Sequence, residues 1–137
     1  MTEKIQTTVA EVMSPDVITI EATATVHDAT ELMRRNHTSS VVVNRRNPDD
    51  EYGLVVVSDI ASNVLAKNLS PKRVNIYEIM SKPVISLPAE MNIVYAVRML
   101  SRFGLSRGLV IDHDRNLLGI VTVRDMVLRN LGDIEGE

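Results

Sequence analysis

The sequence predicts an α+β fold made of two tandem copies of one β-α-β-β-α unit. The first observation is an internal repeat, because Met80-Ser81 lies 67 residues after Met13-Ser14. The same offset joins further pairs, namely Val17 and Val84, Thr19 and Ser86, Ala29 and Ala96, and Ser39 and Ser106. The second observation is the recurrence of β-branched runs and helical periodicity in the same order in both copies. The third is size: a unit of about 60 residues buries too little of its surface to be more than marginally stable alone, so the copies should share a core.

The register of the repeat slips by one residue in the loop between residues 44 and 52. Gly53 aligns with Gly119, and Asp59 aligns with Asp125, at an offset of 66. The first copy therefore has one extra residue in that loop. We expect the repeats to span residues 5–68 and 72–132 and to form one compact module.

Each copy opens with a short capped turn. Thr8 is followed three residues later by Glu11, and Asn75 by Glu78, which is the pattern of a capping box. Beyond the next proline, short β-branched runs predict first strands over residues 17–20 and 84–87.

A helix is predicted to begin near Thr25 in the first copy and near Asn92 in the second. Apolar residues then recur at helical spacing in both copies: Val26, Ala29, Leu32 and Met33 in one, and Ile93, Ala96, Met99 and Leu100 in the other. We expect both stripes to face the core.

Paired strands follow each helix. The first copy has residues 39–43 with 52–57, and the second has residues 108–111 with 117–123. Their continuous valine runs imply that both faces of each strand are buried. A closing helix is predicted to begin at Asp59 and at Asp125.

Composition narrows the possible functions. A net charge of −3 and 3% aromatic residues argue against a nucleic-acid binder, which needs a basic footprint and stacking platforms. Arg45-Arg46 is followed by three acidic residues and is interpreted as part of a solvated loop. With no cysteine, no membrane-length apolar run and no secretory leader, we expect a soluble, cytoplasmic protein without disulfides or thiolate metal sites.

The residues give little support to catalysis. His27, His37 and His113 are scattered, and neither a nucleophile elbow nor a phosphate loop is present. Asp112-His113-Asp114 lies in a polar loop, and we interpret it as turn chemistry rather than a metal site. We therefore expect no catalytic residues and no bound metal.

The order of motifs resembles a tandem pair of cystathionine-β-synthase (CBS) domains, often called a Bateman module. The second copy has Ile79-Met80-Ser81, Gly104-Leu105-Ser106-Arg107 and the run from Gly119 to Asp125. The first copy has Val12-Met13-Ser14-Pro15, His37-Thr38-Ser39-Ser40 and the run from Gly53 to Asp59. The resemblance implies that the copies pack sheet to sheet around a pseudo-two-fold axis and leave two clefts. It also implies adenosine-containing ligands in those clefts and a flat homodimer.

The resemblance also assigns residues to each cleft, with both copies contributing to each. Cleft one would use Asp16, Ile18, Thr38, Ser39, Ile120, Thr122 and Asp125. Cleft two would use Val84, Ile85, Leu105, Ser106, Arg107, Leu54, Val56 and Asp59.

An ionised aspartate suits a ribose, because its two oxygens can accept both hydroxyl hydrogens in bonds of about 1.5 to 3 kcal/mol each. The same charge repels phosphate, for which Arg107, Arg124 and His37 are the candidates. We expect AMP, ADP or ATP as the ligand. S-adenosylmethionine is an alternative, since its sulfonium and ribose would also suit Asp125.

The same residues have simpler structural interpretations. Thr122-x-x-Asp125 is itself a capping box, Ser39 and Ser106 can serve local backbone, Arg107 can be a solvated arginine, and His37 can complement a helix dipole. At the first copy's junction Val56 offers no hydroxyl, and Ser58 could be the cap instead. We therefore expect cleft one to be the better ribose site. The leading hypothesis is a non-catalytic adenine-nucleotide sensor, and the alternative is a ligand-independent dimerisation or regulatory scaffold.

Overall fold

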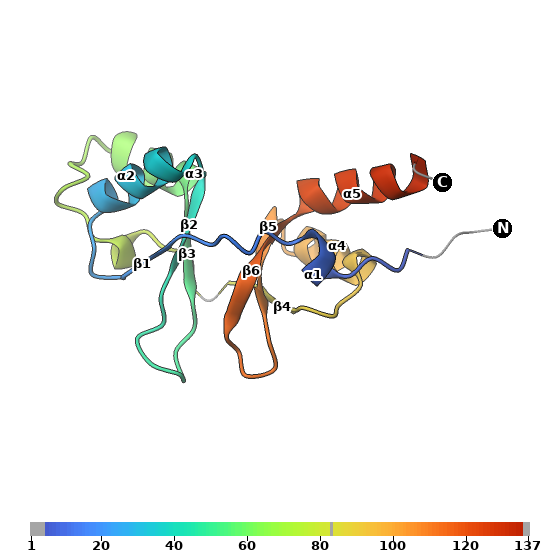
Figure 1. Ribbon diagram of the computed structural model, residues 1–137. Helices are drawn as coiled ribbons and strands as arrows, with labels where there is room; N and C mark the ends of the chain where they lie inside the picture. Colours follow the sequence, from blue (N-terminus) through green and yellow to red (C-terminus); the bar gives the residue numbers. More distant parts are fainter. Residues whose placement is uncertain (1–4, 83, 136–137) are drawn as a thin grey trace. The chain divides into compact units, whose positions relative to one another are not determined.

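The computed structural model describes residues 5–82 and 84–135, with side chains described as far as Asn130 (Figure 1). The chain forms two compact units. The first, here called the repeat-1 unit, contains residues 17–82 and Val84. The second, the repeat-2 unit, contains residues 5–16 together with 85–135. Each unit carries one three-stranded mixed sheet with helices, as the sequence predicted.

The sheet of the repeat-1 unit has the strand order β1-β2-β3. Its strands are β1 (Thr19–Ile20), β2 (Ser40–Val43) and β3 (Gly53–Val56), with β1 parallel and β3 antiparallel to β2. Its helical elements are α2 (Val26–Asn36), α3 (Val57–Ile60), a π-helical turn η1 (Ala61–Leu65) that continues α3, and a short 3-10 turn η2 (Ile76–Glu78). The strand, helix, strand, strand, helix order predicted for one copy is therefore confirmed.

Helix α2 begins where the sequence predicted, and the reason is a capping box. The Thr25 hydroxyl accepts a hydrogen bond from the Asp28 amide at 3.2 Å, while the Asp28 carboxylate accepts one from the Thr25 amide at 3.1 Å. Val26, Ala29 and Met33 are buried, so the predicted stripe does face the core.

The repeat-2 unit has the same topology, in the order β4-β5-β6. Its strands are β4 (Ser86–Pro88), β5 (Arg107–Ile111) and β6 (Leu117–Thr122), and its helices are α1 (Val9–Val12), α4 (Ile93–Arg102) and α5 (Val123–Glu135). Figure 1 shows the three helices gathered on one side of this sheet. There Val9 of α1, Leu100 of α4 and Met126 of α5 join one hydrophobic core.

Two boundaries differ from the sequence predictions. The closing helices begin at Val57 and Val123, two residues earlier than expected, because the capping positions are Val56 and Thr122 and each aspartate is the third helical residue. The first strands are also shorter than predicted, since only two or three residues of each make ladder pairs.

The segments that lead into each repeat, residues 5–16 and 72–82, are exchanged between the units. We call them lead segment 1 and lead segment 2. Ser14 of lead segment 1 exchanges two backbone hydrogen bonds, at 2.8 and 3.0 Å, with Ile120 of β6. Ser81 of lead segment 2 does the same with Leu54 of β3, at 2.9 and 3.0 Å. Each unit therefore contains sequence from both repeats.

The exchange explains the paired glycines of the repeat. A Cβ atom at Gly119 would lie 2.6 Å from the Ser14 carbonyl oxygen and 2.8 Å from the Met13 sulfur. At Gly53 a Cβ atom would lie 2.9 Å from the Met80 sulfur. Gly119 thus needs glycine because the backbone of lead segment 1 lies close to the strand, whereas at Gly53 the nearest atom is the sulfur of the flexible Met80 side chain.

The strands are buried on both faces, as their valine runs predicted. Val41, Val43 and Val55 belong to the helix-side core of the repeat-1 unit. Val42 and Leu54, which alternate with them, are also buried, at 1% and 8% exposure. The sheet face opposite the helices is therefore apolar as well.

Candidate adenosine-ligand site

The predicted cleft residues cluster at one end of each sheet, where a closing helix begins. In the repeat-2 unit the Val123 amide donates to the Ser106 carbonyl at 2.9 Å. In the repeat-1 unit the Val57 amide donates to the Ser39 carbonyl at the same distance. The carbonyl of each predicted serine thus accepts a hydrogen bond from the first residue of a closing helix, and each serine is exposed.

Thr122 and Asp125 have different roles in the first turn of α5. The Asp125 amide donates to the Thr122 hydroxyl at 3.0 Å, so the threonine caps the helix, as the structural interpretation predicted. The Asp125 carboxylate is about half exposed, at 49%, and Arg124 lies 3.9 Å away. Among the described residues, nothing donates a hydrogen bond to this carboxylate. Its oxygens are therefore available to a ligand while the backbone that holds them is fixed.

Lead segment 1 brings Asp16 into the same unit as Asp125. Asp16 follows two residues after Ser14, which pairs with Ile120, and its side chain is exposed. Ile120 and Thr122 alternate with the core residue Val121 and so share the sheet face opposite the helices. Four of the residues predicted for cleft one are thus held in the repeat-2 unit, although they come from both ends of the chain.

Arg107 is the other notable polar residue of this unit. It pairs with Thr122 across β5 and β6. Its Nε atom is buried and has no hydrogen-bond partner among the described residues. Arg107 as a residue is intermediate in exposure, so the burial concerns this one donor atom, which is a feature that requires an explanation.

Asp59, the counterpart of Asp125, is used differently in the repeat-1 unit. Its carboxylate accepts a hydrogen bond from the Val56 amide at 3.0 Å. The interpretation of Ser58 as the cap was wrong, since Asp59 satisfies the first turn of α3 from inside the helix. One oxygen of Asp59 is consequently engaged in the fold.

The remaining cleft-one residues lie near the start of β2. The Ile18 carbonyl accepts from the Val42 amide at 2.9 Å, and the Thr38 hydroxyl lies 3.3 Å from the Ser40 carbonyl. His37 ends α2 in a left-handed conformation with φ of 52°, and its side chain is exposed. The equivalent position in the second repeat is Gly104, with φ of 66°. A histidine here adopts a conformation that glycine would adopt with less strain.

The remaining cleft-two residues are divided between the units. Val84 belongs to the repeat-1 unit, while Ile85 lies in the repeat-2 unit and accepts at its carbonyl from the Leu109 amide at 3.0 Å. Leu105 is exposed at 41%, and its amide donates to the Leu100 carbonyl at 2.9 Å. Arg124, proposed for phosphate, is exposed on the first turn of α5.

Asp112 stabilises the hairpin loop of the second repeat. The Asp112 carboxylate accepts from the amides of Asp114 and Asn116 at 2.8 and 2.9 Å, which confirms the turn interpretation. These bonds, chiefly the one from Asn116, lower the pKa of Asp112.

Within the described part of the chain, no three His, Asp or Glu side chains gather in a way that could hold a metal ion. No helix in this part is long and apolar enough to cross a membrane.

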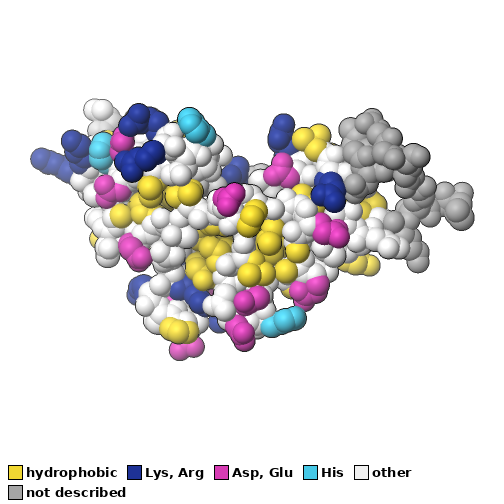
Figure 2. Space-filling view, in the orientation of Figure 1, with side chains coloured by type: hydrophobic (Ala, Val, Ile, Leu, Met, Phe, Trp, Pro, Cys, Tyr) yellow, Lys and Arg dark blue, Asp and Glu magenta, His cyan; other side chains and the backbone are white. Residues whose placement is uncertain are grey.

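Charge is distributed without a dominant sign over the face seen in Figure 2, where basic and acidic side chains are interspersed. This agrees with the small net charge of −3.

Comparison with known proteins decides the family. The CBS domain family model matches twice, over residues 9–66 and 76–131. The chain belongs to the CBS-domain family. Because the two matches cover most of its length, the chain is a CBS-domain pair.

Relatives of the CBS pair include both uncharacterised and structurally solved proteins. An uncharacterised protein of Methanopyrus kandleri is 32% identical over 87% of the chain and 60% of its own length. The chain thus spans about 60% of that relative and of the next curated relative. A hexameric CBS-CP12 protein from bloom-forming cyanobacteria is 32% identical, with a TM-score of 0.87 over 96% of this chain and 75% of that one.

One solved CBS relative contains a nucleotide. It is the CBS domain of a bacterial CNNM/CorC family Mg²⁺ transporter in complex with ATP. It is 25% identical to this chain, with a TM-score of 0.78 over 93% of this chain and 89% of that chain.

Proposed function

We propose that this CBS pair is a non-catalytic sensor that binds an adenosine-containing nucleotide, AMP, ADP or ATP, where the closing helix α5 begins. The carrying observation is the Asp125 carboxylate, which is fixed by the Thr122 cap, half exposed and without a hydrogen-bond donor among the described residues.

Chemistry supports a ribose at Asp125. An ionised carboxylate accepts two hydrogen bonds from a cis-diol, and charge-assisted bonds are stronger than neutral ones. The phosphates would point away from this charge toward a cationic group. Arg107 is favoured in that role by its buried, unpaired Nε atom, and Arg124 and His37 are exposed alternatives. The related transporter domain that binds ATP supports the ligand class.

The proposal predicts unequal sites. Asp59 already accepts the Val56 amide, so a ribose there would have to share or replace that bond. The Asp125 carboxylate accepts no such hydrogen bond from any described residue. We therefore expect one stronger nucleotide site, which depends on Asp125, and one weaker site, which depends on Asp59.

Isothermal titration with AMP, ADP, ATP and S-adenosylmethionine tests the proposal on the wild type, Asp125→Asn and the matched control Asp59→Asn. We expect Asp125→Asn to weaken the stronger site by about 10- to 100-fold, since it weakens one or two charge-assisted bonds. Asp59→Asn should leave that site unchanged. A variant Asp125→Asn that melts earlier but binds equally well would show that Asp125 only supports the helix. Tighter binding of S-adenosylmethionine than of any nucleotide would replace the proposed ligand.

The second candidate is a ligand-independent scaffold. It is favoured by the hydrogen bond between the Asp125 amide and the Thr122 hydroxyl, because this pair serves the helix without any ligand. No detectable binding across the whole panel would favour the scaffold.

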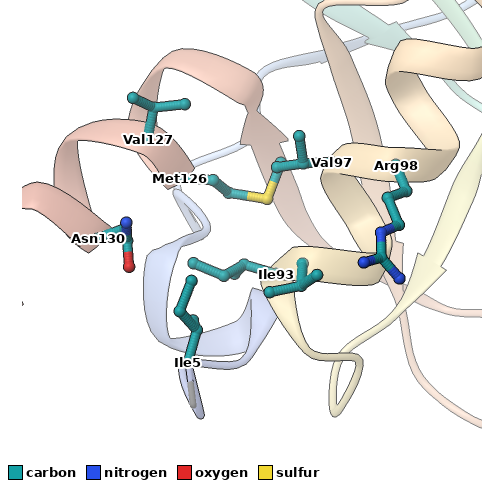
Figure 3. A pocket seen from close by; sticks show the side chains of 8 residues that line it. Ile5, Ile93, Val97, Arg98, Met126, Val127 and Asn130 are labelled. Carbon is teal, nitrogen blue, oxygen red and sulfur yellow. The ribbon is translucent and has the colours of Figure 1, made fainter. Parts of the chain in front are cut away.

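We also propose that the protein assembles with a second copy of itself, as a homodimer. A groove of about 290 Å³ lies between α4, α5 and lead segment 1, lined mainly by apolar side chains (Figure 3). Figure 3 shows Met126 and Val97 side by side at this groove, with Ile5 and Ile93 beneath them in the view. On the same helices, Tyr95 and Val127 are 59% and 53% exposed. The hexameric relative supports self-association in general.

Light scattering on the wild type and on Val127→Glu tests the assembly. We expect the wild type to be a dimer and the glutamate variant to be a monomer that keeps its fold, because Val127 is largely exposed. A monomeric wild type at micromolar concentration would refute the proposal.

A further inference from the structure

Asp50 is a nearly buried carboxylate outside the predicted clefts. It lies in the hairpin loop between β2 and β3, and its side chain is only 9% exposed. Its Oδ2 atom accepts three hydrogen bonds: from the Lys82 ammonium at 2.7 Å, the Arg46 amide at 3.0 Å and the Arg46 Nε at 3.2 Å. The sequence interpretation of this loop as merely solvated was therefore wrong for Asp50.

Lys82 lies just before the point where the chain passes from one unit to the other. Lys82 follows Ser81, which is paired with Leu54 of β3, and precedes Val84 by two residues. The chain passes from the repeat-1 unit to the repeat-2 unit between Val84 and Ile85. Asp50 thus holds lead segment 2 just before that crossing, at a lysine two residues before Val84, which was assigned to cleft two.

The other crossing has no such ion pair. The equivalent of Lys82 in lead segment 1 is Pro15, which has no charge and no side-chain donor. The hairpin loop of the second repeat has Asp112, but its carboxylate bonds to Asp114 and Asn116 within its own loop. The chain itself therefore provides a comparison in which the same backbone pairing exists without the ion pair.

We propose that Asp50 and Lys82 form a positioning clamp for the second nucleotide site, fixing lead segment 2 and Val84 relative to Leu54. The inference rests on the proposed function, because it concerns one of the two sites. At the first site the equivalent residue, Pro15, cannot form such a pair. None of the residues predicted for cleft two lies in the hairpin loop of the first repeat. Through the clamp, this loop nevertheless supports the second site.

The physical basis is local. A carboxylate that is 9% exposed keeps its charge because a lysine and an arginine donate to it, and the Lys82 bond is the largest cause of its lowered pKa. Removing Asp50 takes from Lys82, whose side chain is 23% exposed, its carboxylate partner, and removing Lys82 leaves Asp50 bonded only to Arg46 in its own loop. In either variant the bond between the loop and lead segment 2 is lost, so the two should separate. The backbone pair between Ser81 and Leu54 then loses the neighbouring support of Lys82.

The first test uses no ligand. Hydrogen–deuterium exchange is measured at the Ser81 and Leu54 amides in the full-length wild type, Asp50→Asn, Lys82→Met and the control Asp112→Asn. We expect faster exchange at both amides in Asp50→Asn and Lys82→Met, and no change there in Asp112→Asn. Equal exchange in all four proteins would overturn the clamp, whatever the nucleotide panel shows.

The second test measures ATP affinity in the Asp125→Asn background, where the first site is already weakened. Adding Lys82→Met should weaken the remaining binding by about ten-fold, and Lys82→Arg should restore most of it. A lower melting temperature with unchanged affinity would show that the pair is only structural. No remaining binding in Asp125→Asn itself would overturn the assignment to a second site. No binding by the wild type would instead reject the proposed function and leave the exchange test to judge the clamp.

Discussion

The exchange of lead segments predicts that Gly119→Ala is more damaging than Gly53→Ala. At Gly119 the new Cβ would lie 2.6 Å from a backbone carbonyl oxygen, that of Ser14, which cannot move without disturbing its pairing with Ile120. At Gly53 the contact below 3.0 Å is with the flexible Met80 sulfur, and the Ser81 carbonyl oxygen is 3.4 Å away. Overpacking of a tight site costs about 1 to 3 kcal/mol. Alanine also stabilises by about 0.4 to 1 kcal/mol through the unfolded chain.

The net expectation is a loss of about 1 to 2 kcal/mol for Gly119→Ala and under about 1 kcal/mol for Gly53→Ala. Urea denaturation of both variants and the wild type gives the difference directly. Gly104→Ala is a useful third variant, because φ is 66° and no atom lies within 4 Å, so only backbone strain is added. Equal effects of Gly119→Ala and Gly53→Ala would refute the close approach of lead segment 1 to β6.

Three further predictions concern single side chains. Thr122→Val should cost about 0.5 to 2 kcal/mol in urea denaturation through loss of the α5 cap, while Thr122→Ser should be near neutral. His37→Gly should stabilise the protein by about 0.5 to 1 kcal/mol by relieving a left-handed residue, and a destabilised variant in the same assay would contradict the strain. Because the Lys82 ammonium, with Arg46, holds the pKa of Asp50 below its ordinary 3.8, the pair contributes stability above that value and loses it as pH falls through the lowered pKa. The stability gap between wild type and Asp50→Asn should therefore be constant from about pH 8 to 5 and close only in stronger acid, and a gap that closes by pH 6 would exclude this cause.

Much of the fold could be predicted from the sequence because its signals are local. The capping pair Thr25 and Asp28, the helical stripe that begins at Val26 and the valine runs each act within a few residues, and each produced the expected element. The helix starts at Val57 and Val123 were missed by two residues, because each aspartate is the third residue of its helix and the capping positions are Val56 and Thr122.

The exchange of lead segments could not be predicted from the repeat. An offset of 67 states which residues are equivalent, but equivalent residues in two copies can pair within a repeat or between repeats with the same pattern. The paired glycines, Gly53 and Gly119, were the available signal, since glycine in a strand often marks a close backbone approach. Asp50 and Lys82 were missed for a related reason, because charged residues 32 apart in sequence carry no periodic signal.

The central claim is that the nucleotide binds where α5 begins, at Asp125. Amide chemical shifts measured during titration with ATP test it most directly. We predict the largest changes at Asp16, Thr122 and Asp125 of the repeat-2 unit. Saturable changes that leave these three amides unmoved, or that centre on the groove between α4 and α5, would contradict the claim.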